Sequence, residues 1–428
     1  MSFLTWTSVF AAALVASLGI RAWLLARQVR HVARHRNEVP AAFRPSVELA
    51  AHQRAADYTL AKARLAHWQM LVGAAVLLGW TLFGGLDALN TLVRDAVAPR
   101  AGALAYEVTL IAAFVVVGAV LDLPFEWYST FRLEQRFGFN RITWRLWLAD
   151  TAKGIALGAV IGIPLLAAVL WIMGAAGSAW WLWAWAAWMA IIVAAQVVVP
   201  SFIAPLFNRF EELEDAPLRA RVEALMARAG FAARGLFVMD GSRRSAHANA
   251  YFTGFGSAKR VVFFDTLLAR LAAGEVEAVL AHELGHFKLR HIRKRMVAMA
   301  AMTLAFFALL GWLATKAWFY VGLGVAPNLS LPNDALALVL LLLVSSVFGV
   351  FASPLFAGWS RRDEFEADAF ASVHADRSEL ASALLKLHED NAATLTPDPL
   401  YARFYYSHPP AVERLAALVR RSPEPIAP

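Results

Sequence analysis

Five consecutive residues, His282-Glu283-Leu284-Gly285-His286, form an H-E-x-x-H motif. On a helix, residues four apart lie on one face, so His282 and His286 can present two imidazoles to a single zinc ion. Glu283 would then lie beside the metal, where it can take a proton from a water molecule that the metal activates. The motif therefore predicts zinc-dependent hydrolysis. A match this short also arises by chance in long chains, so its surroundings must decide.

A third protein ligand is needed, because catalytic zinc sites use three and leave one position for water. The chain has no cysteine, which restricts the third ligand to His, Asp or Glu. We expect this ligand in the segment 360–370, where Glu364 and Asp368 lie four residues apart on one helical face. Glu364 could bind zinc, and Asp368 could orient a ligand imidazole from behind. Taken alone, the segment would read as an ordinary charged helix at a membrane surface.

Other residues near the motif are less suitable as ligands. The metzincin extension of the motif would require Gly and His at the positions of Leu289 and Ile292, so that class is excluded. His291 lies five positions beyond His286, on another face of a continuous helix, and we predict that it is a solvated member of a basic patch. We likewise expect Glu366 to be solvated.

The elements that position the motif form one polar region, residues 201–295, which we expect to be a small α/β unit. The predicted elements are a helix at 211–229 ended by Gly230, a strand at 235–239, a turn at 240–241, strands at 249–253 and 260–264 joined by a Gly-containing loop, a short helix opened by Asp265, and the motif helix at 274–290. An exposed edge strand could hold an extended peptide by main-chain pairing. Alternatively, these strands are only a scaffold.

The composition places this region in a membrane protein. Of 428 residues, 59% are hydrophobic and 17% are charged, against roughly one-quarter charged in soluble domains. We predict a mainly α polytopic protein in which seven transmembrane helices enclose a chamber. The predicted spans are 3–25, 69–88, 108–121, 154–173, 179–199, 297–315 and 335–357, of which the third is short and extends or tilts into its flanks.

The distribution of charge predicts the orientation. The net charge of +8 is concentrated in the loops after the first and third spans, which accounts for it without a nucleic-acid partner. By the positive-inside rule, the N-terminus lies outside and the C-terminus and the motif lie on the cytoplasmic side. No basic residue precedes the first span, so we interpret it as a retained signal anchor.

These elements divide the chain into four regions. We assign residues 1–200 to an N-terminal membrane region with five spans, 201–296 to the α/β metalloprotease segment, 297–358 to spans six and seven, and 359–428 to a C-terminal helical segment that completes the zinc site.

Several further segments have distinctive sequences. They are 134–143 with Phe137-Gly138-Phe139-Asn140, 203–207, 245–255 with Asn249-Ala250-Tyr251, 261–268, 281–287, 360–371 and Ser407-His408-Pro409-Pro410. Together they resemble the type I CAAX prenyl protease family, multispanning zinc endopeptidases of the gluzincin group. The resemblance covers most of the chain from about Pro124 onward, and the combination is highly specific.

The resemblance implies an activity and a site. It implies one zinc ion per chain, held by His282, His286 and Glu364, with Glu283 as the catalytic base. It implies that Asn249, Ala250 and Tyr251 belong to the edge strand that binds the substrate backbone. It also places His408 and Arg414 near the active site, where we expect them to donate to the developing oxyanion. The alternative for His408 is a simple turn before a helix at 412–419.

The expected substrate is a peptide or protein, and lipidated or hydrophobic substrates suit a wide apolar chamber. Eukaryotic members of the family cleave C-terminal CaaX tripeptides from prenylated proteins. The richness in Ala and Arg is typical of bacteria, which generally do not prenylate proteins, so we expect a bacterial inner membrane location and leave the natural substrate open. Membrane lipid is the second expected partner.

Two alternatives are less consistent with the sequence. A heat-shock-type quality-control metalloprotease would have about four spans. A transporter with an accidental motif would have ionisable residues within its spans, and few are present, namely Asp87, Glu107 and Asp122. A membrane scaffold that had lost catalysis would be expected to lack Glu283 or a ligand, and none of these is missing.

Overall fold

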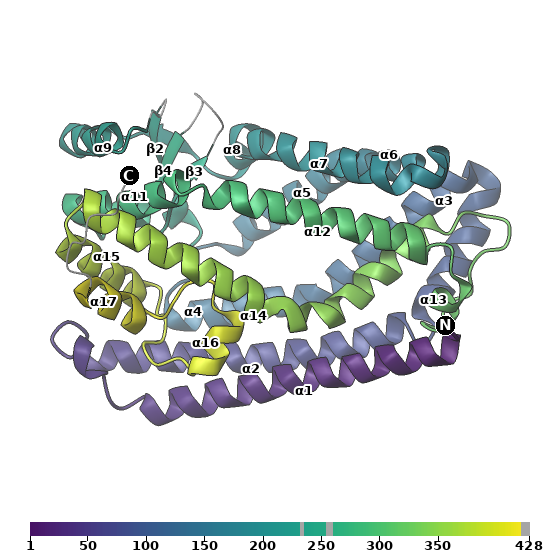
Figure 1. Cartoon of the computed structure of the whole chain (residues 1–428), viewed down its shortest axis with the longest axis horizontal. Helices are drawn as coiled ribbons and strands as arrows, with labels where there is room; N and C mark the ends of the chain where they lie inside the picture. Colours follow the sequence, from purple (N-terminus) through teal and green to yellow (C-terminus); the bar gives the residue numbers. More distant parts are fainter. Residues whose placement is uncertain (232–234, 254–259, 421–428) are drawn as a thin grey trace.

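The computed structural model describes residues 1–231, 235–253 and 260–420, which form long helices and one small sheet (Figure 1). The N-terminal half contains α1 Phe3–His35, α2 Leu49–Trp80, α3 Gly85–Tyr128, α4 Gln135–Phe137, α5 Trp144–Leu157, α6 Ile163–Ala175, α7 Trp180–Val198 and α8 Ala204–Phe207. The middle contains β1 Phe210–Glu212, α9 Ala216–Arg228, β2 Gly235–Met239, β3 Ala250–Thr253, β4 Arg260–Phe264, α10 Asp265–Leu268 and α11 Ala273–Lys288. The remainder contains α12 His291–Leu313, α13 Ala317–Val321, α14 Asp334–His374, α15 Arg377–Asp390, α16 Pro399–Tyr405 and α17 Ala411–Arg420.

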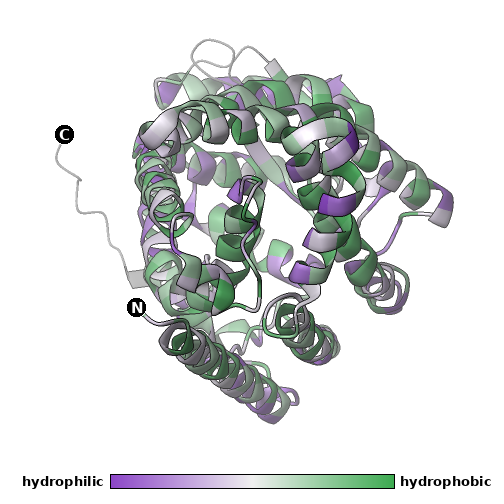
Figure 2. Ribbon diagram, turned by 90° about the vertical axis from the view of Figure 1, so that its right-hand side faces the viewer, coloured by the Kyte–Doolittle hydropathy of each residue, from purple (hydrophilic) through white to green (hydrophobic). Residues whose placement is uncertain are grey.

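The long helices form a ring around the long axis of the molecule (Figure 2). Each helix packs against the next in the order α1, α2, α3, α6, α7, α12 and α14, and α14 packs against α1 to close the ring. Within the described residues, six helical segments are long and apolar enough to cross a membrane: Phe3–His35, Gly85–Phe137, Trp144–Ala175, Gly177–Phe207, His291–Leu313 and Asp334–His374. The protein is therefore a multi-pass integral membrane protein, as its composition predicts.

The predicted second span, 69–88, is wrong in its bounds. The chain turns between α2 and α3 at residues 81–84, and Gly84 has φ 76°, a left-handed conformation that a side chain would disfavour. Hydropathy averages over such a turn, because the residues on both sides are apolar. The third span, in contrast, extends beyond the predicted 108–121: α3 breaks at Gly102, which has φ 82°, and the part after this break ends at Tyr128.

The apolar surfaces of several spans are not covered by other parts of the described chain. In the most apolar window of the segment Gly177–Phe207 none of the residues is buried, and in those of Gly85–Phe137 and Trp144–Ala175 only 6% are. Lipid is the medium in which such surfaces are stable, because their backbone polar groups are satisfied within the helices. The low burial of these segments is thus consistent with their crossing a membrane.

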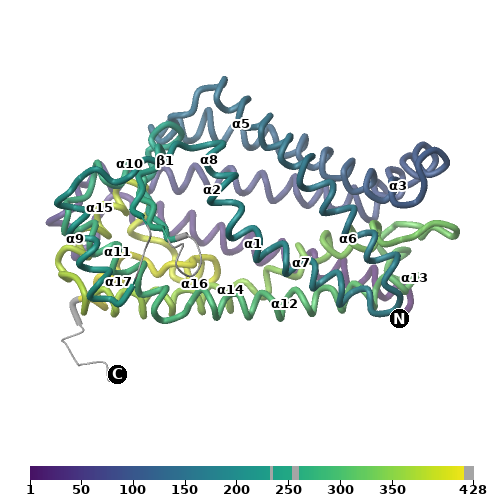
Figure 3. The backbone as a smooth tube through the Cα atoms, turned by 90° about the horizontal axis from the view of Figure 1, so that it is seen from above, coloured from purple at the N-terminus to yellow at the C-terminus, as the bar shows by residue number. Residues whose placement is uncertain are grey.

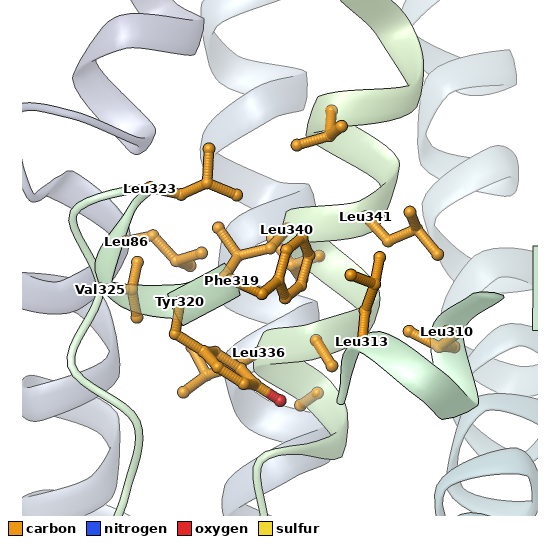
Figure 4. Close-up of a cluster of buried hydrophobic side chains, with 14 of the residues drawn as sticks. Leu86, Leu310, Leu313, Phe319, Tyr320, Leu323, Val325, Leu336, Leu340 and Leu341 are labelled. Carbon is orange, nitrogen blue, oxygen red and sulfur yellow. The ribbon is translucent and has the colours of Figure 1, made fainter. Parts of the chain in front are cut away.

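A buried cluster fixes the end of the ring that is distant from the sheet (Figure 4). Phe319 and Tyr320 of α13 are almost fully buried among Leu86 of α3, Leu313 of α12 and Leu336 of α14. Burial of one large apolar side chain contributes about 1.5–3 kcal/mol. The short helix α13 therefore joins the α2–α3 turn to the facing ends of α12 and α14.

The sheet has the order β1-β2-β4-β3, with β2 and β4 parallel and β3 at an edge. The predicted strand at 235–239 is confirmed, as is the short helix at Asp265, and Gly230 has φ 58° as expected of a residue that ends a helix. The predicted helix at 211–229 is wrong in its first turn: Phe210–Glu212 pairs with β2, and α9 begins at Ala216 after the N-cap Asp215. Pairing with a distant strand outweighs local helical spacing here. The predicted loop between β3 and β4 lies outside the described residues.

The sheet, α9, α11, α15 and α17 lie together at the end of the molecule opposite the N-terminus (Figure 1, Figure 3). α14 reaches this end as one unbroken helix of 41 residues, so the predicted boundary between regions at 358 and 359 falls inside a helix. α12 also begins at His291, before the predicted boundary at 297. The same two long helices therefore line the ring and enter the α/β end.

Candidate metal centre

The motif lies on α11, whose first turn is fixed from two sides. The Glu275 carboxylate accepts a hydrogen bond from the backbone N–H of Ala272 at 2.7 Å, which satisfies a donor that the helix itself leaves unpaired. The same carboxylate accepts from Ser382 Oγ at 2.5 Å and from Lys386 Nζ at 2.8 Å, both on α15. α15 therefore sets the position of α11 along its axis.

α11 and α14 are in unusually close contact at Gly285. A Cβ atom added to Gly285 would lie 3.0 Å from the Ala367 Cα and 3.1 Å from the Phe370 Cβ of α14. Only the absence of a side chain at Gly285 permits this approach. Glu364, which lies 82 positions from His282 in the chain, reaches the motif because of it.

Three side chains from these helices converge. The Glu364 carboxylate lies 3.4 Å from His282 Nε2 through one oxygen and 3.4 Å from His286 Nε2 through the other, and the two Nε2 atoms are 3.3 Å apart. Their potential ligand atoms all lie within 4.8 Å of one another. Glu364 Oε2 is buried and, among the described residues, has no hydrogen-bond partner. The site thus offers two imidazoles and one carboxylate, and one oxygen of that carboxylate is buried without a hydrogen bond. This set of groups fits a divalent metal ion of the zinc type.

His282 is held from behind by Asp368. Asp368 Oδ1 lies 2.8 Å from His282 Nδ1, and Arg414 donates to Asp368 from Nε at 2.8 Å and from Nη2 at 2.5 Å. Both Asp368 and Arg414 are buried. Burial by itself would lower the pKa of His282, but the hydrogen bond to Asp368 and the nearby Glu364 carboxylate outweigh it and raise this pKa to about 9. This arrangement fixes the ring so that Nε2 faces Glu364.

Glu283 lies among these groups on the same helix. Burial raises the pKa of Glu283, and the nearby Glu364 carboxylate adds to this effect, while His282 and His286 oppose it. A general acid or base works best when its pKa lies near the working pH, and a raised pKa brings a carboxyl group closer to that condition.

His408 approaches the same carboxylate from the C-terminal segment. His408 Nε2 lies 3.4 Å from Glu364 Oε1. The His408 side chain is 66% exposed, and it lines a cavity of about 580 Å³ that Tyr58, His388 and Tyr406 also line. Although the ring is open to this cavity, the surrounding protein lowers the pKa of His408, and the Glu364 carboxylate offsets only part of the effect. The lowered pKa favours the neutral form of the ring, which borders both the cavity and the Glu364 carboxylate.

The structure thus brings seven of the predicted residues together, and three others lie apart. Asn249, Ala250 and Tyr251 are at the start of the edge strand β3, where Asn249 Oδ1 accepts from the Ala250 backbone N–H at 2.9 Å. β3 packs against α11, so its unpaired edge belongs to the same end of the molecule. Tyr251 lines a separate cavity of about 530 Å³ with Phe237 and Val262.

The prediction for His291 is wrong, because this residue is buried, with 1% of its surface exposed. α11 ends at Lys288, and Arg290 has φ 59°, so His291 begins a new helix and does not follow the face expected for a continuous one. Its Nδ1 lies 3.0 Å from His286 Nδ1, and its Nε2 lies 3.2 Å from Glu366 Oε2. Glu366 is consequently only partly solvated. The prediction did not include the helix break between α11 and α12. The sequence gives no indication of this break, because the residue in the left-handed region is an arginine and not a glycine.

The chain is similar to known proteins over most of its length. Residues 28–209 match the family model described as CAAX prenyl protease N-terminal, five membrane helices, and residues 212–422 match peptidase family M48. The chain is 35% identical to a CAAX prenyl protease 1 homolog of Arabidopsis thaliana, over 79% of this chain and 80% of that protein. It is 30% identical to CAAX prenyl protease 1 of Saccharomyces cerevisiae, over 96% and 95%. The crystal structure of S. mikatae Ste24p superposes with a TM-score of 0.90 at 29% identity and covers 98% of this chain and 100% of that one.

Proposed function

Because the chain belongs to peptidase family M48 and is a multi-pass membrane metalloendopeptidase, we propose that it uses one zinc ion to cleave lipidated or hydrophobic peptides. The observation that carries this proposal is the convergence of His282, His286 and Glu364, with ligand atoms within 4.8 Å of one another, beside Glu283. These three side chains would hold the zinc ion.

The chemistry requires a nucleophile, a proton carrier and a group that receives negative charge. A zinc ion bound there would polarise the peptide carbonyl and make a water molecule acidic enough to react near neutral pH. Glu283 takes the proton from that water and delivers it to the leaving amine, which its raised pKa favours. His408 donates to the carbonyl oxygen as negative charge develops on it. No acyl-enzyme forms, so inhibitors of serine and cysteine proteases leave the activity unchanged.

We assign positioning roles to Asp368 and Arg414. Two of the donor groups of Arg414 are taken by Asp368, and its Nη1 lies 3.9 Å from Glu364 Oε2. The contribution of Arg414 is therefore to hold the carboxylate that orients His282, and its Nη1 remains directed at the centre. The family resemblance leads instead to the expectation that Arg414 donates directly to the oxyanion.

The substrate backbone would bind along the free edge of β3. Ala250 and Tyr251 begin this edge strand, Asn249 directly precedes it, and β4 pairs with its other side. An extended peptide that pairs with β3 would pass beside α11, which β3 contacts. The cavity that His408 lines would receive residues next to the scissile bond.

The orientation in the membrane follows from charge and shape together. The N-terminus and the metal centre lie at opposite ends of the molecule (Figure 3). The basic loops after the first and third spans support an orientation in which the end with the metal centre is cytoplasmic and the N-terminus lies outside. We propose a bacterial inner membrane as the location. Five N-terminal membrane helices of the CAAX prenyl protease type favour this function over a quality-control protease with four spans.

The proposal is tested with purified protein by metal analysis and by cleavage of a farnesylated CaaX peptide and its unprenylated counterpart. Wild-type protein is expected to contain one zinc ion per chain. Glu283→Gln should retain zinc and lose at least about 10²-fold in activity, while Glu364→Ala should lose both. Glu413→Gln, an exposed neighbour of Arg414 on α17, is the matched control and should be unaffected.

A wild-type protein without metal, or an active Glu283→Gln variant, would contradict the proposal. Equal cleavage of the two peptides would restrict the substrate class to hydrophobic peptides, without a requirement for a lipid.

A further inference from the structure

We infer that His291 is a positioning residue that holds the second metal-ligand imidazole, His286, by accepting a hydrogen bond from its Nδ1. This inference rests on the proposed zinc site. It concerns His291, which lies outside the H-E-x-x-H motif. The observation behind it is that His291 is buried and lies with Nδ1 3.0 Å from His286 Nδ1.

The backbone break after α11 turns His291 toward the centre. Arg290 adopts a left-handed conformation with φ 59°, and α12 begins at the next residue. The ring of His291 therefore packs against that of His286, with ring centroids 5.1 Å apart and an angle of 72° between the planes. An edge-on approach of this kind allows a nitrogen of one ring to face a nitrogen of the other.

The geometry decides which nitrogen carries each proton. His286 Nε2 faces Glu364 and His282, so this nitrogen would bind the metal and its Nδ1 must carry the hydrogen. His291 Nδ1 then has to be the acceptor, which leaves the His291 hydrogen on Nε2. That nitrogen lies 3.2 Å from Glu366 Oε2 and 3.8 Å from Asp363 Oδ1, so its hydrogen also has an acceptor.

Both supports of the metal ligands therefore come from α14. His282 is held by Asp368 directly, and His286 is held by Glu366 through His291. Asp363, Glu364, Glu366 and Asp368 belong to two consecutive turns of this helix, so one rigid element supplies a ligand and the supports of the other two. Such supports fix the ring orientation and the basicity of a ligand imidazole.

The same residues could be considered as a second metal site, because the potential ligand atoms of His291, Asp363 and Glu366 lie within 4.8 Å of one another. Two observations favour the positioning role. Asp363 is paired with Arg295 at 3.1 Å, and Glu366 is paired with Arg362 at 3.1 Å, so a cation would have to displace two guanidinium groups. His291 Nδ1 is also turned toward His286 and away from both carboxylates.

Two substitutions separate the roles of the two nitrogens of His291. In His291→Asn the amide ends where Nδ1 lies in histidine, so Asn Oδ1 can still accept from His286. In His291→Gln the longer amide reaches the position of Nε2, so it keeps the contact with Glu366 and loses the acceptor at His286. A residue that only fills space and binds Glu366 would tolerate Gln better than Asn.

The measurement is zinc affinity of the purified full-length protein by competition with a chromophoric chelator, together with the thermal stability of the zinc-free form. We expect His291→Asn to remain within about threefold of the wild-type affinity and His291→Gln to weaken it by about 10- to 100-fold. The visible spectrum of the cobalt-substituted protein should shift in His291→Gln and not in His291→Asn. Affinity in His291→Gln equal to or higher than in His291→Asn, or two tightly bound zinc ions per wild-type chain, would overturn the inference.

A further variant covers the case in which neither substitution at His291 folds. Glu366→Ala removes the partly exposed support and should weaken zinc binding with little change in the stability of the zinc-free form, and an unchanged affinity would refute the inference. Failure of the proposed zinc site itself is distinguishable, because the wild-type protein would then bind no zinc.

Discussion

The close approach of α11 and α14 at Gly285 predicts that the substitution Gly285→Ala separates the ligands of the metal centre. The added Cβ would lie 3.0 Å from Ala367 Cα and 3.2 Å from the Ala367 carbonyl oxygen, against about 3.5–4.0 Å for an ordinary contact between carbon atoms. Both neighbours are backbone atoms of a long helix, so they cannot rotate away. The two helices would have to move apart by about half an ångström, which is the tolerance within which a functional site holds its geometry.

The effect on stability has two opposing parts. Replacement of a helical glycine by alanine stabilises a helix by about 1 kcal/mol, while the overpacked contact costs about 1–3 kcal/mol. Gly285→Ala should therefore be destabilising by up to about 2 kcal/mol and should weaken zinc binding. Gly349→Ala in α14 is the matched control, because an added Cβ there meets nothing within 4 Å. This control should gain about 1 kcal/mol and bind zinc normally.

The assay is thermal unfolding of the zinc-free protein in detergent, with zinc affinity measured on the same samples. If Gly285→Ala is stabilised as much as Gly349→Ala and binds zinc with wild-type affinity, then the contact with Ala367 does not set the distance between the helices and the reasoning is refuted.

Three further predictions concern residues around the centre. Asp368→Asn should weaken zinc binding by about 10- to 100-fold, because the carboxylate that orients His282 is lost, and equal affinities by chelator competition would contradict this. Arg290→Gly should stabilise the protein by up to about 1 kcal/mol, since glycine adopts φ 59° without strain. Arg293→Gly within α12 should instead destabilise it by about 1 kcal/mol, and the reverse order of melting temperatures would disprove the account of the helix break. Burial lowers the pKa of His388 from 6.5 to about 4, so the unfolded chain takes up a proton first, and stability that is present above pH 6.5 is lost as the pH falls toward 4. The difference corresponds to about 3 kcal/mol, and a His388→Gln variant with the same pH dependence of unfolding would rule this out.

Local periodicity was sufficient for the parts of the site that lie on one helix. The spacing of His282 and His286 puts them on one face of α11 whatever else the chain does, because helix geometry repeats every 3.6 residues. In the same way, Glu364 and Asp368 lie on one face of α14. The strand 235–239 and the membrane spans also follow from apolar patterning, since burial in a sheet or in lipid imposes a pattern that is visible in the sequence.

Patterning failed where one element had to end. The span predicted at 69–88 contains the turn between α2 and α3, and the predicted helix at 211–229 contains strand β1. The predicted environment of His291 is wrong for the same reason, because α11 ends at Lys288, three residues before His291, and the left-handed Arg290 redirects the chain. In each case the decisive interaction is made with residues far along the chain or by a single backbone angle, and neither leaves a periodic signal.

The residue types and their spacing specify the chemistry of this protein: a pair of imidazoles with an adjacent carboxylate, no cysteine, and apolar segments that require a membrane. The completion of the site depends instead on how the helices pack. Glu364 meets the two histidines because α14 is continuous from the membrane ring into the α/β end and because Gly285 lets α11 approach it closely. The supports behind the ligands, Asp368 with Arg414 on one side and His291 with Glu366 on the other, depend on the packing of three helices that are distant in sequence. Their physical basis is close packing between rigid elements, which local spacing cannot encode.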